Sequence, residues 1–194
     1  MLSFDQISAA RARELERKLQ TKLADYIEWR EGGFDAERFR NSRDYRLGEV
    51  IPYDWIPYGA ELDGQDPLQQ RGWHVQIYYK GRPRYYVRCT KLDVGWAVRW
   101  IGESWLAKDV ATGIRWLDHR ESELPTSKVR LVSSRIYKFS SFRLVESSRH
   151  LVVSASDRLR SVLPRNRLLS QKELLRRLLD YFGKDVSQGG VLPD

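Results

Sequence analysis

The spacing of apolar residues changes twice along the chain, and this change constrains the fold more than any other feature. Leu15, Leu19 and Leu23 recur every four residues, the spacing of one face of an α-helix. From Trp73 onward apolar and polar residues alternate, which is typical of strands with one buried face. After Ser170 the helical spacing returns. The sequence therefore predicts an α+β fold with a long amphipathic helix first, an antiparallel sheet in the middle and a helix last.

Capping boxes mark the starts of both terminal helices. In this motif a Ser or Thr and a Glu or Gln three residues later satisfy backbone N–H groups that the first turn leaves free. Ser3 with Gln6 opens the N-terminal helix, and Ser170 with Glu173 opens the C-terminal one. Glycine and proline are common at and beyond helix ends. The expected helix ends are Gly32 and Gly33 for the first helix, Gly183 for the last, and Pro164 for a shorter helix over 157–163.

The middle of the chain contains many short segments with a period of two. The candidate strands are 73–79, 84–91, 96–101, 105–110, 114–119, 128–139, 142–146 and 151–155. Turn-forming residues at 80–83, 93–95 and 111–113 separate several of them. Short connections favour an antiparallel meander, and seven or eight such strands are expected to curl into a bent sheet or a barrel.

The segment before these strands is harder to assign. Residues 34–43 have the composition of a short second helix, whereas Pro52, Pro57 and Pro67 interrupt the residues after it, so we expect an ordered connector. The resulting organisation is a helical arm over 1–45, an antiparallel β domain with an aromatic-rich core over 46–169, and a C-terminal helix and tail over 170–194.

Charge is distributed very unevenly along the 194 residues. Residues 1–70 carry ten Lys/Arg and fourteen Asp/Glu, whereas residues 71–194 carry twenty-four and twelve. The excess is largest over 128–177, with thirteen basic and three acidic residues. Arginine outnumbers lysine by twenty-five to nine, and its planar guanidinium suits bidentate contacts with phosphate. The second half of the chain is therefore predicted to bind a polyanion, and DNA and RNA both fit.

Aromatic and basic residues alternate on the predicted strands, a pattern typical of surfaces that stack bases and hold phosphates. Period two places Arg84, Tyr86 and Arg88 on one face, although buried aromatics with arginines extending outward give the same pattern. Four more arginines surround the predicted helix over 157–163. The candidate nucleic-acid-binding residues are Arg84, Tyr86, Arg88, Arg130, Arg135, Lys138, Arg143, Arg149, Arg158, Arg160, Arg165 and Arg167.

The tryptophans allow two interpretations. Trp96, Trp100, Trp105 and Trp116 fall in the region of predicted strands, so we expect most of them to build the core. Any that is exposed would instead be an anchor at an interface.

Signs of catalysis are weak. Asp118, His119, Glu121 and Glu123 form the only candidate acid/base or Mg²⁺ cluster, and a solvated loop after a strand is the favoured explanation for them. Cys89, the single cysteine, is expected to be a small buried thiol. No metal site or cofactor is predicted.

Three observations bear on location. One cysteine excludes an intrachain disulfide, the first residues lack the pattern of a signal peptide, and no run of eighteen apolar residues occurs. A cytoplasmic protein without a membrane segment is expected.

The leading hypothesis is a non-enzymatic nucleic-acid-binding protein or a subunit of a nucleoprotein complex. A second hypothesis is an assembly subunit that docks an acidic protein and self-associates or binds a protein partner through residues 1–31. A third is a metal-dependent nuclease centred on His119. The sequence leaves all three open.

Overall fold

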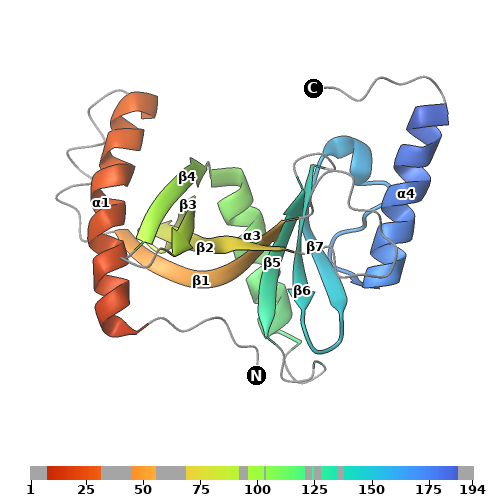
Figure 1. Ribbon diagram of the computed structural model, residues 1–194, viewed down its shortest axis with the longest axis horizontal. Coiled ribbons are helices and arrows are strands. Elements are labelled where there is room, and N and C mark those ends of the chain that lie inside the picture. Colours follow the sequence, from red (N-terminus) through yellow and green to blue (C-terminus); the bar gives the residue numbers. More distant parts are fainter. Residues whose placement is uncertain are drawn as a thin grey trace. The chain divides into compact units, whose positions relative to one another are not determined.

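The computed structural model describes residues 8–31, 45–55, 69–91, 96–102, 104–120, 124, 128–134 and 138–187. These residues form three α-helices, one 3-10 helix and eight strands (Figure 1). The helices are α1 (Ala9–Glu31), α3 (Ser104–Asp118), η2 (Asp157–Leu159, 3-10) and α4 (Gln171–Ser187). The strands are β1 (Tyr45–Trp55), β2 (Gln69–Tyr79), β3 (Arg82–Lys91), β4 (Trp96–Gly102), β5 (Val129–Ser134), β6 (Phe139–Leu144), β7 (Arg149–Ala155) and β8 (Leu168–Ser170).

The strands follow the order β4-β3-β2-β1-β5-β6-β7-β8. The successive pairs from β2 to β4 and from β5 to β8 are antiparallel. The α+β class, the terminal helices and the antiparallel sheet are thus confirmed, but the sheet is open, so the predicted closure into a barrel is wrong. Among the described residues, no helix combines the length and the apolar character needed to cross a membrane.

The chain divides into two compact units. The first, called the N-terminal unit here, comprises Ser3–Tyr53 and Gln70–Thr112. The second, the C-terminal unit, comprises Asp54–Gln69 and Gly113–Asp194 together with the first two residues. β1, β2 and α3 therefore each contribute residues to both units.

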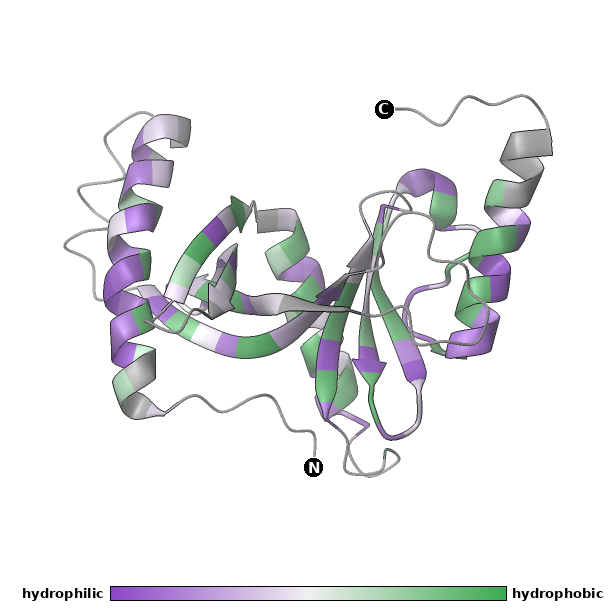
Figure 2. Cartoon of the chain, viewed as in Figure 1, coloured by the Kyte–Doolittle hydropathy of each residue, from purple (hydrophilic) through white to green (hydrophobic). Residues whose placement is uncertain are grey.

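In the N-terminal unit, α1 covers the sheet with the leucines that gave its helical spacing. Leu15, Leu19 and Leu23 are at most 1% exposed and pack in one cluster with Val75 and Val87, which are paired on β2 and β3. Most of the other residues of the helix are hydrophilic (Figure 2). The apolar face of α1 is thus buried in its own unit, which leaves these three leucines unavailable to a second copy of the chain.

In the C-terminal unit, the sheet is covered on both faces. Val152 of β7 belongs to the core cluster that α4 completes with Leu174 and Leu178. The next residue, Val153, points to the opposite face because side chains alternate along a strand. There a Cβ built on Gly113 of α3 would overlap Val153. Strands β5 to β7 are consequently buried along nearly their whole length.

The main error of the sequence prediction is α3, which replaces the strands expected at 105–110 and 114–119. Its buried residues are Leu106, Ala107, Val110, Ala111, Gly113, Ile114 and Leu117, and most of these positions recur at helical spacings of three and four. Reading the residues 111–113 as a turn hid this pattern. Because Gly113 sits inside the helix, it allows α3 to lie close to the sheet rather than to reverse the chain.

Smaller differences also have physical reasons. The expected connector contains β1, in which Pro52 removes one backbone donor without ending the strand. The strand expected over 128–139 is interrupted, because Lys138 lies in a turn with a φ of 48° before β6 begins. Gly183 does not end α4, since a helix interior tolerates glycine at a cost of about 1 kcal/mol. The short helix at 157 is a 3-10 turn.

Ser3, Gln6, Gly32, Gly33 and residues 34–43 lie outside the described residues.

Replacing Gly113 by alanine tests how α3 packs. Alanine normally stabilises a helix interior relative to glycine by about 1 kcal/mol. Here the new Cβ would run into the side chains of Val153 and Phe142, so we expect the variant to lose about 1–3 kcal/mol of unfolding free energy instead. Chemical denaturation measures the change. Thr112→Ala, on the exposed side of the same turn, serves as control, and a Gly113→Ala variant as stable as wild type would contradict this packing.

Candidate nucleic-acid interface

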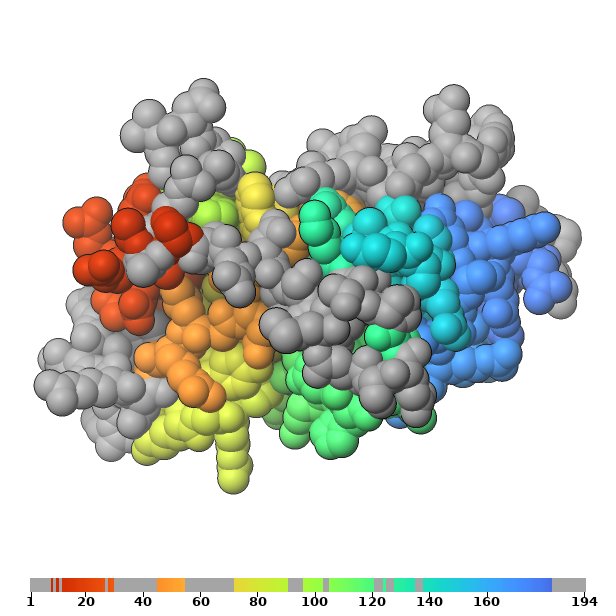
Figure 3. All heavy atoms as spheres, turned by 90° about the horizontal axis from the view of Figure 1, so that it is seen from below, coloured from red at the N-terminus to blue at the C-terminus, as the bar shows by residue number. Residues whose placement is uncertain are grey.

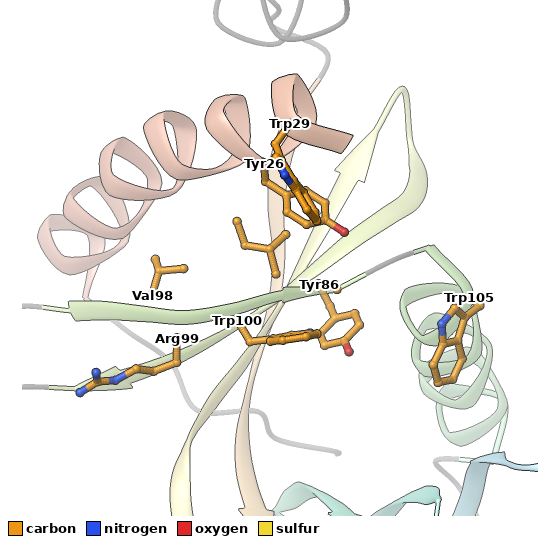
Figure 4. Close-up of a pocket in the computed structure, with 9 residues that line it drawn as sticks. Tyr26, Trp29, Tyr86, Val98, Arg99, Trp100 and Trp105 are labelled. Carbon is orange, nitrogen blue, oxygen red and sulfur yellow. The ribbon is translucent and has the colours of Figure 1, made fainter. Parts of the chain in front are cut away.

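Three exposed tryptophans of the N-terminal unit line one groove (Figure 4). Among the described residues, the exposed large hydrophobic side chains are Trp29, Trp100, Trp105 and Leu179, with 76%, 51%, 57% and 53% of their surface accessible. Leu179 lies on α4, whereas the tryptophans come from α1, β4 and the start of α3. A tryptophan has a large apolar area, so three exposed at one place make this groove a candidate binding surface.

The groove has an aromatic end and a basic end, and we call it the α1–β4 groove. Its aromatic end has a volume of about 710 Å³ and is lined by Tyr26, Trp29, Tyr86, Val98, Arg99, Trp100, Ile101, Gly102 and Trp105. Its basic end has a volume of about 610 Å³ and is lined by Arg17, Lys18, Thr21, Lys22, Trp96, Ala97 and Val98. Val98 lines both ends, so the two cavities are neighbours along β4.

The local structure explains why these side chains meet. On α1, Lys18, Lys22, Tyr26 and Trp29 follow one another at steps of four, four and three residues, and therefore form one stripe along the helix. On β4, Trp96 and Val98 face α1, but the register shifts after Val98, so Trp100 pairs with Arg88 and lies on the opposite face of the strand. The stripe on α1 changes from basic to aromatic, whereas the only cation of β4, Arg99, lines the aromatic end. The Lys18 ammonium fixes α1 to β4 at the basic end by donating to the Trp96 carbonyl oxygen at 3.2 Å.

Charges along the groove are of one sign. Arg17, Lys22 and Arg99 are exposed, and no described carboxylate lines either end. Lys18 forms an ion pair with Glu14 of the preceding helical turn at 3.2 Å, which neutralises part of its charge. Three cations therefore remain available to an anionic ligand.

The groove wall at Tyr86 rests on a buried polar network. The Tyr86 ring stacks on His74 with 5.0 Å between ring centroids and an interplanar angle of 11°. It fits beside Gly102, its pairing partner on β4, because any Cβ there would overlap the ring. His74 Nε2 lies 3.0 Å from Gln76 Oε1, and the Gln76 amide donates to the Ala107 carbonyl at 2.7 Å. The carbonyl end of Gln76 thus faces His74, which fixes the neutral Nε2–H tautomer.

His74 cannot easily accept a second proton. Its side chain is fully buried, and its Nδ1 has no hydrogen-bond partner in the described structure. Burial lowers the pKa of His74 to about 3, the hydrogen bond to Gln76 opposes this shift, and the nearby Arg88 guanidinium adds to it. His74 is consequently a neutral structural support for Tyr86 rather than a catalytic acid or base at neutral pH.

Of Arg84, Tyr86 and Arg88, which were predicted to share one face of a strand, only Arg84 is exposed. Tyr86 is buried at 6% exposure and contributes part of the groove wall, not an open stacking face. The Arg88 guanidinium lies 4.5 Å from the Tyr53 ring centroid and 5.6 Å from that of Tyr86, which engages it in cation–π contacts. Arg84 is exposed and lies above Tyr85.

In the C-terminal unit, predicted arginines gather on the segment from η2 to α4, which we call the η2–α4 surface. Over 156–178 it carries seven basic and two acidic residues. Arg158, Arg160, Arg165 and Arg167 are all exposed, and Arg160 pairs with exposed Asp157 at 2.8 Å. The blue residues in Figure 3, which include this segment, form a continuous part of the visible surface.

The pKa of Glu173 reflects the positive charges around it on this surface. A hydrogen bond from Arg177 is the main reason that the pKa of Glu173 is lowered, and the charges of Arg177, Arg167 and Arg176 add to it while desolvation opposes it. Arg177 lies 2.8 Å from the Glu173 carboxylate and also donates to the Val162 carbonyl, whereas Arg167 is 3.9 Å from Glu173. Arg177 and Arg167 thus share one carboxylate. At the start of α4, the Glu173 backbone N–H donates to the Ser170 hydroxyl at 3.1 Å, as the capping box predicts.

The remaining predicted cations are more scattered. Arg130 is held by buried Asp54 through two contacts of 2.6 Å, so its charge is already neutralised. Arg143, its partner across β5 and β6, is half-buried. Lys138 and Arg149 are exposed at opposite ends of the β6–β7 region, and Arg135 lies outside the described residues.

The weak catalytic candidates do not assemble into a described site. Asp118 ends α3 and His119 follows it, so neither follows a strand, and His119 Nδ1 lies 2.6 Å from the Arg115 carbonyl of the same helix. Glu121 and Glu123 lie outside the described residues. Within the described part of the chain, no group of three His, Cys, Asp or Glu side chains could hold a metal ion. Burial raises the pKa of the Cys89 thiol to about 12, as befits a core residue.

One further pair resembles the beginning of a hydrolase dyad. Ser141 Oγ lies 3.2 Å from His150 Nδ1 on neighbouring strands. Both side chains are at most 2% exposed between the two helical layers of the C-terminal unit, so a substrate cannot reach the hydroxyl. The pair is a buried hydrogen bond of the core.

Comparisons with known proteins give no further guide. Protein-family models, curated proteins and solved structures all show no match to this chain. Its function must therefore be argued from the two surfaces themselves.

Sequence reasoning missed most of the groove. It expected Trp100 and Trp105 in the core, with interface anchoring as the alternative, and their exposure favours that alternative. Arg17 and Lys22 were not among its candidate binding residues. The stripe of Lys18, Lys22 and Tyr26 was visible at i, i+4 spacing, but its neighbour β4 lies more than sixty residues later in the chain, and only the fold brings the two together.

Proposed function

We propose that this protein is a non-enzymatic nucleic-acid-binding protein, or such a subunit of a nucleoprotein complex, and that it acts in the cytoplasm. In this proposal the η2–α4 surface holds the phosphate backbone. The observation that carries the proposal is the excess of seven basic over two acidic residues within 156–178, with Arg158, Arg160, Arg165 and Arg167 all exposed.

An excess of guanidinium groups over carboxylates attracts a polyanion. Arg167 and Arg176 are exposed, whereas Arg177 is half-buried and held by Glu173 and the Val162 carbonyl oxygen. Arginine donates to phosphate oxygens through a planar fork, so adjacent arginines on a helix and on the segment before it suit a run of phosphates. Phosphate contacts of this kind give affinity without sequence specificity.

An acidic protein is the alternative partner, because its carboxylates would also neutralise these arginines. We favour nucleic acid because the chain exposes aromatic faces as well as cations, in the form of Trp29, Trp100 and Trp105. Bases stack on aromatic rings, whereas acidic side chains gain nothing comparable from them.

The test is the triple variant Arg165→Gln/Arg167→Gln/Arg176→Gln of the full chain. Each lost phosphate contact removes about one unit from the salt dependence of binding, so we expect affinity for labelled oligonucleotides at low salt to fall roughly tenfold or more. Fluorescence anisotropy measures it, with Arg82→Gln, an exposed arginine of the N-terminal unit, as the matched control.

An unchanged affinity in the triple variant would remove the η2–α4 surface from the proposal. Equal binding of polyglutamate and an oligonucleotide of the same length would instead favour the acidic-protein alternative. Loss of affinity in the Arg82→Gln control to the same extent would show a diffuse charge effect and contradict a localised surface.

A further inference from the structure

We infer that the α1–β4 groove binds unpaired nucleotides of a single strand, with bases against its tryptophans and phosphates at its basic end. This inference rests on the proposed function and extends it, because it selects single-stranded over duplex nucleic acid. It also assigns the base contacts to the N-terminal unit, which contains most of the acidic first part of the chain.

The geometry of the walls supports an extended ligand. From Lys18 to Trp29 the helix advances about 16 Å, and from Trp96 to Gly102 the strand advances about 20 Å. The α1 wall therefore offers cations first and aromatic rings afterwards, whereas β4 places its cation, Arg99, and its exposed ring, Trp100, together at the aromatic end. A single strand has the matching arrangement, because each of its bases is joined to a phosphate that can lie farther along the groove.

The aromatic end offers ring faces to a ligand. Trp29 is the most exposed large hydrophobic residue described, and its ring lies 6.2 Å from that of Tyr26 with the planes tilted by 46°. In Figure 4, Tyr26 and Trp29 extend from α1 on one side of β4, Trp100 lies beside Tyr86 on the other side of this strand, and Trp105 extends from α3. A flat, unpaired base can stack on such rings with little dependence on its identity.

The charge of the groove decides between the possible ligands. An extended peptide could also lie on tryptophans, and an amphipathic one would bring its own basic or acidic groups. The groove is lined by Arg17, Lys18, Lys22 and Arg99, with no described carboxylate on either wall. A polynucleotide matches that lining best, because it repeats an anionic phosphate joined to an aromatic base.

Duplex nucleic acid fits this site poorly. In a duplex, base faces are stacked on one another and only base edges are accessible in the grooves. Tryptophan faces need bases that are already unstacked, which single strands, loops and ends provide. The η2–α4 surface, by contrast, contacts only phosphates and would accept either form.

The experiment compares a dT12 single strand with a 12-base-pair duplex on the full chain, using tryptophan fluorescence and anisotropy. We expect dT12 to quench the fluorescence. Trp29→Ala and Trp100→Ala should each weaken dT12 binding roughly tenfold, within the range of one lost base–aromatic stack, and leave duplex binding within twofold. Trp29→Phe, which retains a ring, should restore most of the affinity. Leu179→Ala removes an equally exposed apolar side chain outside the groove and should change neither.

The outcomes separate this inference from the proposed function. If the arginine triple variant weakens binding but both tryptophan variants bind dT12 as wild type does, the groove assignment is wrong and the η2–α4 surface stands. If the tryptophan variants weaken duplex and single-strand binding equally, selectivity for unpaired bases is wrong. If no oligonucleotide binds while a peptide quenches the tryptophans, both proposals fall. Thermal unfolding of each variant confirms that these exposed substitutions leave the fold intact.

Discussion

Replacing Asp54 by alanine is expected to lower the free energy of unfolding by about 3–5 kcal/mol, the largest effect that the structure predicts for one side chain. The Asp54 side chain is only 4% exposed and accepts from Arg130 Nε and Nη2 at 2.6 Å each. Arg130 is itself only 26% exposed, so removal of the carboxylate leaves a guanidinium largely shielded from water. The cost is that of an uncompensated charge rather than of one lost contact.

Urea denaturation of Asp54→Ala against wild type measures this effect. Asp157 is a suitable control because it also pairs with an arginine but is 87% exposed, and its replacement by alanine should cost at most about 0.5 kcal/mol. Changing both partners, as in Asp54→Leu/Arg130→Met, should recover much of the loss. Equal costs for Asp54→Ala and Asp157→Ala would contradict a buried, structural role for the pair.

Acidification is expected to destabilise the protein through His74, well above the pH at which most carboxylates titrate. The unfolded chain binds a proton near the ordinary pKa of 6.5, whereas burial delays protonation in the folded protein to about pH 3. Because the unfolded state binds more protons between these values, stability is full above pH 6.5 and falls as the pH decreases toward 3. The slope approaches about 1.4 kcal/mol per pH unit, or about 2–3 kcal/mol lost by pH 4.5.

Denaturation curves at pH 7 and pH 4.5 for wild type and His74→Gln isolate this contribution. The variant has no imidazole to protonate, so its loss of stability between the two pH values should be smaller by about 2–3 kcal/mol. It is expected to be less stable than wild type at pH 7, because Tyr86 loses its stacking partner. An identical pH dependence in both proteins would show that His74 titrates normally and is accessible to water.

The fold was predictable where one periodicity dominates and local chemistry agrees with it. Leu15, Leu19 and Leu23 face the sheet as their spacing predicts, and the Ser170 hydroxyl caps α4. Strands β2 and β3 were found because the turn at Lys80 and Gly81 separates two alternating segments, and both residues have positive φ there.

Prediction failed where a residue has an uncommon role. Gly113 reads as a turn former, but its missing Cβ serves close packing of α3 against Phe142 and Val153, which no local pattern reveals. Pro52 reads as a strand breaker and nevertheless lies within β1. These errors concern whole elements. The helix α3 replaces two expected strands, and the sheet is open instead of closed.

The candidate surfaces were predictable to different degrees. Four arginines of the η2–α4 surface were identified because a charge excess within one segment survives folding when the segment stays exposed. The α1–β4 groove was not, because exposure of Trp29, Trp100 and Trp105 depends on which side chains cover them in three dimensions. Arg88 and Arg130 looked equally basic in sequence, yet aromatic rings engage the first and Asp54 neutralises the second.

The most direct test of nucleic-acid binding is a salt titration of the full chain with dT12, monitored by tryptophan fluorescence. We expect quenching at low salt and a log-log dependence of affinity on salt with a slope of about −0.7 for each neutralised phosphate. For three phosphates, affinity should fall roughly twentyfold between 50 and 200 mM salt. Absence of binding at low salt, or an affinity that salt does not change, would contradict nucleic-acid binding by these surfaces.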